Sequence, residues 1–178
     1  MPRQFSLRTL LVVTTLAGFA AGAVAFRTMR ARRIEAALFY LEIEHDIFLN
    51  KADDGWHVVV DDSVDPKVDL GRLRDIGPIS EISLYGAWMD DSRLSFVKGL
   101  SVKTIELCRT GVTDQGFSVL RSAKGLTKVV LESSSLQRLE ELSECPDLEE
   151  LEVMRGSFVD LEIRSGFRSL SRLRIESQ

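Results

Sequence analysis

A regular spacing of short apolar segments constrains the fold of this chain more than any other feature of its sequence. Six such segments occur, and their marker residues follow one another at intervals of 24, 23, 24, 22 and 22 residues. The markers, each the second apolar residue of its segment, are Val60, Leu84, Leu107, Leu131, Val153 and Ile175. A constant period in the low twenties is typical of solenoids in which each unit is one strand followed by a helical turn. We therefore expect an α/β fold, a short solenoid of parallel strands with helical turns.

Polar residues between the strands and the helical turns match the needs of a helix start. Asp90 and Thr113 stand where a helical turn begins, so their side-chain oxygens can accept hydrogen bonds from backbone N–H groups that lack a partner within the helix. Asp91 and Asp114 follow in the first turn, where the helix dipole favours a negative charge. We expect these residues to stabilise the helix starts rather than to bind a ligand.

The same stretch carries a resemblance to a known family. The sequence LCRTGVTDQGF, over residues 107–117, resembles the LxxTxVTDxGL core of a bacterial leucine-rich repeat subtype. Residues 84–94 fit the same frame with Ala87 in the threonine position, whereas the units at Leu131 and Val153 keep the strand and lose the Thr-Asp pair. The resemblance implies a parallel-sheet solenoid that is used for binding. It does not imply an enzyme.

The segment before the repeats has a different character. Residues 9–26 form an uncharged run of 18 residues without proline, at the lower limit of what a membrane-spanning helix needs. We predict a transmembrane helix there, acting as a signal-anchor. The opening RQFSLRTLL also resembles leaders of bacterial membrane-anchored leucine-rich repeat proteins. Two alternatives remain, a signal peptide cleaved after the Ala23-Val24-Ala25 site and a buried helix of a globular domain.

These observations predict five parts in the chain. We expect a basic N-terminal tail over residues 1–8, the transmembrane helix over 9–26 and a juxtamembrane helix over 27–42. A capping hairpin with a transition unit follows over residues 43–78, and the leucine-rich repeats occupy residues 79–178. The hairpin follows from the turn signal Asp54-Gly55 between two apolar stretches. The last strand has no predicted cap, so we also expect a partner chain or self-association to cover this C-terminal edge strand.

The distribution of charge sets the predicted partners. The net charge is −4, but residues 1–33 hold six arginines and no acid, which leaves −10 on the remainder. We expect residues 9–33 to contact membrane lipid in a single-pass protein. The count of flanking arginines leaves open on which side of the membrane the repeats lie. Nucleic-acid binding by the acidic repeats is disfavoured because it requires a basic surface.

The predicted interaction surface is the row of strand residues that alternate with the apolar markers. In a leucine-rich repeat these residues line the concave face of the sheet. The candidate residues are Tyr85, Glu106, Cys108, Glu132, Glu152, Met154 and Arg174, with Trp88 as a possible anchor. We expect a protein or peptide partner of basic character, because the row is rich in acids and aromatic residues dominate interface energies. The alternatives are a solvated face and a Trp88 that is buried against the neighbouring unit.

No recognisable catalytic, metal-binding or cofactor-binding pattern occurs in the sequence. The two cysteines, Cys108 and Cys145, lie in different units, and His45 and His57 have no third ligand at a recognisable spacing. We therefore expect a non-catalytic, membrane-anchored interaction module that uses no cofactor. The alternatives are a secreted or periplasmic repeat protein and a structural envelope protein.

Overall fold

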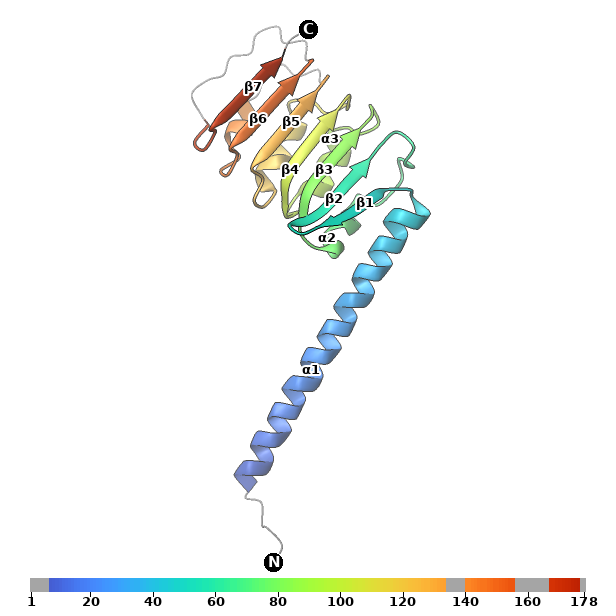
Figure 1. Ribbon diagram of the computed structural model, residues 1–178, viewed down its shortest axis with the longest axis vertical. Helices are drawn as coiled ribbons and strands as arrows, with labels where there is room; N and C mark the ends of the chain where they lie inside the picture. The colour runs from blue at the N-terminus through green and yellow to red at the C-terminus, as the bar shows by residue number, and fades with distance from the viewer. Residues whose placement is uncertain (1–6, 134–139, 156–166, 177–178) are drawn as a thin grey trace, which may run out of the picture. The chain divides into compact units, whose positions relative to one another are not determined.

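The computed structural model describes residues 7–133, 140–155 and 167–176, and the chain divides into two units, Met1–Ala36 and Ala37–Gln178 (Figure 1). The first unit consists of helix α1 (Leu7–Leu38), whose last two residues belong to the second unit. The described side chains between residues 14 and 33 are all exposed. The helix continues through Arg27 without a break, so the predicted boundary between residues 26 and 27 does not mark a change in secondary structure.

The predicted transmembrane helix is corrected by the structure. Within the part of the chain that the structure describes, no helix is long and apolar enough to cross a membrane. Spanning requires about 20 predominantly apolar residues. The second half of α1 carries Arg27, Arg30, Arg32 and Arg33, which interrupt its apolar character. This finding overturns the transmembrane helix over residues 9–26 and the single-pass membrane location that depended on it.

The described residues of the second unit form one sheet of seven strands that lie side by side in the order of the sequence (Figure 1). The strands are β1 (Phe48–Ala52), β2 (Gly55–Val60), β3 (Ile79–Tyr85), β4 (Val102–Cys108), β5 (Lys128–Glu132), β6 (Glu150–Met154) and β7 (Arg172–Glu176). β1 and β2 form an antiparallel hairpin, and every later pair is parallel. The chain is therefore an α/β protein with a mostly parallel sheet.

The strand register aligns the apolar markers of successive units. Val60, Leu84, Leu107, Leu131, Val153 and Ile175 are neighbours across the sheet. All of them except Ile175 are buried. Side chains alternate between the two faces of a strand. The markers therefore share a face with the apolar residues two positions before them, such as Ile82, Ile105 and Val129. That face forms the core.

Short helical segments before β1 and between the later strands supply the other side of the core. They are η1 (Phe39–Glu44), η2 (Leu70–Arg72), α2 (Leu73–Ile76), α3 (Asp91–Leu94), η3 (Ser95–Val97), η4 (Gly116–Ser122) and α4 (Glu140–Ser143). Leu73, Leu94 and Phe117 from this layer are completely buried, and they belong to the same apolar cluster as the strand markers. The core thus lies between the sheet and the helical segments, and none of the helical segments in the described residues covers the opposite face of the sheet.

Two aspartates hold the turns of this layer in place. The side chain of Asp90 accepts a hydrogen bond from the Arg93 N–H at 3.0 Å and caps α3, as the sequence predicts. Asp91 has a further role, because its carboxylate accepts hydrogen bonds from the N–H and the hydroxyl of Thr113 at 2.7 and 2.6 Å. Thr113 lies 22 residues further along the chain. Asp91 therefore connects neighbouring units.

Candidate interaction surface on the sheet

The face of the sheet opposite the core carries three rows of side chains, which we call the polar face. The first row is His57, Glu81, Thr104, Lys128, Glu150 and Arg172. The second is Val59, Ser83, Glu106, Val130, Glu152 and Arg174, and the third is Tyr85, Cys108, Glu132, Met154 and Glu176. These residues occupy alternate strand positions, so they point away from the core.

The structure brings seven of the eight predicted site residues together on the polar face. Glu106, Glu152 and Arg174 lie in its second row, and Tyr85, Cys108, Glu132 and Met154 lie in its third. The sequence interpretation omitted the first row. Counting the alternation back by two further residues in each strand would have found it, since side chains two apart along a strand share a face.

The carboxylates over β5, β6 and β7 are neutralised within the polar face. Lys128 Nζ lies 2.8 Å from Glu152 Oε1 and 3.6 Å from Glu150 Oε2. Arg172 Nη1 lies 3.0 Å from Glu150 Oε1, and Arg155 Nη1 lies 3.2 Å from Glu132 Oε1. The hydrogen bond between Lys128 and Glu152 raises the pKa of the lysine and lowers the pKa of the glutamate. The Glu152 side chain is only 15% exposed. These glutamates are therefore already paired with cations of the same chain and are less available to the basic side chains of a partner.

The carboxylates over β3 and β4 have hydrogen-bonding or histidine neighbours instead of described lysine or arginine partners. Glu81 faces His57, with 3.7 Å between Glu81 Oε2 and His57 Nδ1, and both side chains are exposed. Glu106 Oε2 accepts a hydrogen bond from the Ser83 hydroxyl at 2.7 Å. Within the described residues, neither carboxylate forms a salt bridge with a lysine or an arginine. The part of the polar face over β2, β3 and β4 therefore carries two carboxylates that have no lysine or arginine ion pair among the described residues. We call it the acidic end.

Cys108 is buried between acidic groups in the middle of the polar face. Its Sγ donates a long hydrogen bond of 3.6 Å to Glu132 Oε2. Burial and the nearby carboxylates of Glu106 and Glu132 raise the pKa of the thiol to about 12. Burial, Glu106 and Cys108 also raise the pKa of Tyr85. Both groups are thus held in their neutral form, and Cys108 lacks the thiolate character that a nucleophile needs.

The two cysteines are expected to be unreactive in the folded protein. Burial also raises the pKa of Cys145, to about 11. Since the thiolate is the reactive form, native protein at pH 8 should react with a thiol reagent at least about a hundredfold more slowly than the same protein in urea. The measurement is the rate of colour release from an aromatic disulfide. Rapid modification of one thiol in the native state would contradict the buried, neutral position of that cysteine.

Trp88 lies outside the polar face, in the segment that follows β3. Its ring is partly buried and packs against the core, and the Arg93 guanidinium lies 5.4 Å from the ring centroid. The indole Nε1 is buried and has no hydrogen-bond partner among the described residues. The structure thus places most of the indole within the fold, in line with the alternative of a tryptophan packed against its neighbours.

The histidines lie in separate surroundings. The ring of His45 meets Tyr40 edge-on with 4.4 Å between the centroids, whereas His57 faces Glu81 on the polar face. Within the described residues, no group of three or more His, Cys, Asp or Glu side chains could hold a metal ion.

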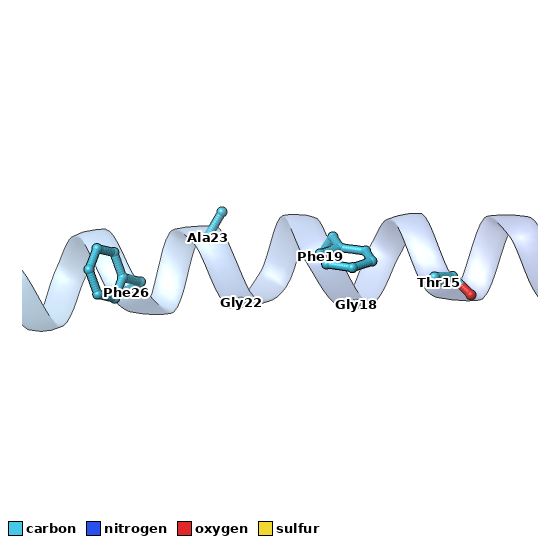
Figure 2. Close-up of a pocket in the computed structure, with 6 residues that line it drawn as sticks. All are labelled: Thr15, Gly18, Phe19, Gly22, Ala23 and Phe26. Atoms are coloured by element: carbon cyan, nitrogen blue, oxygen red, sulfur yellow. The ribbon is translucent and has the colours of Figure 1, made fainter.

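Two hollows lie away from the sheet face. The first is on α1 and is formed by Thr15, Gly18, Phe19, Gly22, Ala23 and Phe26, as Figure 2 shows. Its lining includes two glycines and two phenylalanines, and none of the residues that form it is titratable. The second lies between η2 and α3 and is polar. In it, Arg74 Nη2 donates hydrogen bonds to the carbonyl oxygens of Phe96 and Lys98 at 2.8 and 2.9 Å. Arg74 therefore connects two units of the helical layer.

No protein-family model and no curated protein matches this chain. The proposed function therefore rests on the geometry of the polar face.

Proposed function

We propose that the second unit is a non-catalytic binding module of the leucine-rich repeat type, and that its polar face binds an extended protein segment with basic side chains. The observation that carries this proposal is the acidic end. Glu81 and Glu106 are partly exposed on adjacent strands and lack a described lysine or arginine partner. A lysine or arginine from a partner can supply the missing charge.

The surroundings of the acidic end favour a polypeptide over a small molecule. The polar face lies on an open sheet, and partly exposed side chains such as Tyr85 and Met154 stand among the charges. Tyrosine provides a large contact area at low conformational cost. The paired charges over β5, β6 and β7 would then form the rim of the interface, where they contribute more to selection among partners than to affinity.

Catalysis has no support from the same residues. A nucleophile needs an adjacent base or a lowered pKa. Cys108 has neither, since its neighbours Glu106 and Glu132 raise its pKa instead of lowering it. The Ser83 hydroxyl donates a hydrogen bond to Glu106, but Ser83 is buried in the middle of strand β3 and does not line either of the two hollows. The cluster is better suited to contact than to chemistry.

Binding of a basic peptide tests the proposal directly. An extended peptide of alternating lysine and serine is titrated into the full chain at low salt, and the affinity is compared with that of the Glu81→Gln/Glu106→Gln double variant. We expect about fivefold weaker binding by the variant, because each lost exposed charge pair is worth up to about 1 kcal/mol. The control is Glu42→Gln/Glu44→Gln, which changes the net charge equally at two exposed positions outside the polar face.

The control separates site binding from general attraction. If the peptide binds through the acidic end, the control variant should keep the wild-type affinity within about twofold. Equal weakening by both double variants would show that only the overall negative charge of the chain attracts the peptide. That result, or the absence of binding to the wild type, would contradict the proposed function.

A further inference from the structure

The outer edge of β7 offers a second surface, independent of the polar face. No described strand pairs with this edge, because β7 is the last strand of the sheet. All five residues of β7 are exposed, and they include two apolar side chains on the core side, Leu173 at 39% and Ile175 at 42%. An open edge that combines free backbone groups with apolar side chains is a template for pairing with another strand.

The hydrogen bonds to β6 determine which backbone groups of β7 face outward. The N–H of Arg172 donates to the Glu149 carbonyl at 3.0 Å, and the carbonyl of Glu176 accepts from the Arg155 N–H at 2.9 Å. Residues that alternate along a strand direct their N–H and C=O groups to the same side. The groups of residues 172, 174 and 176 therefore point to β6. Those of Leu173 and Ile175 point away from the sheet.

An antiparallel pairing of β7 with the β7 strand of a second copy uses all of these groups. When Arg174 lies opposite its own counterpart, Leu173 lies opposite Ile175 of the other copy, and each such pair exchanges two hydrogen bonds. On the core side, the two apolar side chains then cover each other. On the polar side, Arg172 lies opposite Glu176 of the other copy, so opposite charges meet on both sides of the two-fold axis.

A register centred on Leu173 fits less well. A shift that places Leu173 opposite its own counterpart brings Arg172 opposite Arg174 of the second copy, which sets like charges against each other. The register centred on Arg174 does place two arginines together. Each of them, however, already contacts Glu176 of its own chain, and the charge of Arg174 lowers the pKa of Glu152. These carboxylates offset the repulsion.

We propose that β7 pairs with β7 of a second copy of this chain, antiparallel and centred on Arg174, so that the sheets of two molecules join into one. A two-fold axis requires one surface to be complementary to itself. Residues 172–176 meet that requirement in backbone hydrogen bonds, apolar contacts and charge.

The first test is a disulfide at the two-fold axis in the full chain. The variant Arg174→Cys places two thiols at a non-hydrogen-bonded position, where the Cα atoms lie about 4.5 Å apart, within the range of a disulfide. The matched control is Arg172→Cys, which is exposed on the same strand and lies far from its counterpart in this register. Mild oxidation should yield at least about tenfold more covalent dimer for Arg174→Cys than for Arg172→Cys. Equal yields, or a higher yield for the control, would overturn the register.

The second test measures association without a crosslink, by sedimentation equilibrium. The wild type should form a reversible dimer, and Ile175→Lys should weaken the dimer at least about tenfold, because the lysine enters the interface twice. The control is Phe48→Lys on β1, the strand at the opposite end of the sheet, where the native side chain is 62% exposed. Circular dichroism verifies that both variants are folded. Should Ile175→Lys fail to fold, the disulfide yields still decide the question.

Three outcomes would overturn the proposal. One is a wild type that stays monomeric up to a concentration of about 0.1 mM, the range in which weak specific complexes form. The second is a dimer that is weakened by Phe48→Lys and not by Ile175→Lys. The third is protection of the Leu173 and Ile175 amides from hydrogen exchange that does not depend on protein concentration, since it would mean that another part of the same chain covers the edge. A dimer through β7 would leave the proposed function of the polar face unaffected, because the peptide titration reports on β3 and β4.

Discussion

Replacement of Phe117 by alanine is expected to lower the free energy of unfolding by about 3–5 kcal/mol. Phe117 is 0% exposed and ranks among the largest completely buried side chains of the described residues. It lies in η4, which contacts α3, η3 and α4, and its side chain belongs to the apolar core cluster. Removal of the ring loses the transfer free energy and leaves a cavity that the surrounding units close only in part.

Urea denaturation followed by circular dichroism measures this effect. Phe48→Ala is the matched control, because it removes the same side chain from a position that is 62% exposed, and it should change the free energy of unfolding by less than about 0.5 kcal/mol. A loss below about 1 kcal/mol for Phe117→Ala would show that the helical layer is not packed around this residue.

Replacement of Asp91 by alanine is expected to cost about 2 kcal/mol of stability. The Asp91 carboxylate accepts hydrogen bonds from both the N–H and the hydroxyl of Thr113, at 2.7 and 2.6 Å. Hydrogen bonds to a charged group contribute about 1.5–3 kcal/mol. Gly116 packs against the same carboxylate, because a Cβ at that position would clash with Asp91 Oδ1.

A double-mutant cycle isolates the interaction between the two units. Thr113→Val removes the hydroxyl and leaves the backbone N–H in place. If the hydroxyl and the carboxylate interact as described, the double variant should be more stable than the sum of the two single effects predicts, by about 1 kcal/mol. Additive effects would contradict a direct interaction across the unit boundary.

The sequence predicted the strands better than the contacts between them. The period of the apolar residues located the markers Leu84, Leu107, Leu131, Val153 and Ile175, and the register aligns all five. This succeeds because burial of one face of a strand imposes alternation on the residues themselves. The cap at Asp90 was predictable for a similar reason, since it depends on residues three positions apart.

The uncharged run near the N-terminus led to an incorrect prediction. Residues 9–26 suggested a transmembrane helix, and the described part of the chain contains no helix that could cross a membrane. Apolar composition alone does not establish a span, because a sufficient length of apolar helix is required as well.

The sequence predicted which residues form the candidate site but not how they are paired. Its residues could be named from the alternation of side chains, and the structure finds Glu106, Glu132 and Glu152 on one face. Their differences could not be predicted. Glu152 is neutralised by Lys128, Glu132 by Arg155, and Glu106 is hydrogen-bonded to Ser83, and each of these partners lies at least 23 residues away in the chain.

The sequence by itself thus determined the strand positions, the face that each side chain occupies, and the acidic character of the sheet unit. These properties follow from local alternation and composition, which operate over a few residues. Only the tertiary structure decided which carboxylates are paired with cations, that Asp91 connects two units, and that the backbone groups of Leu173 and Ile175 face outward. Those features depend on the strand register, because register brings residues more than 20 positions apart within hydrogen-bonding distance.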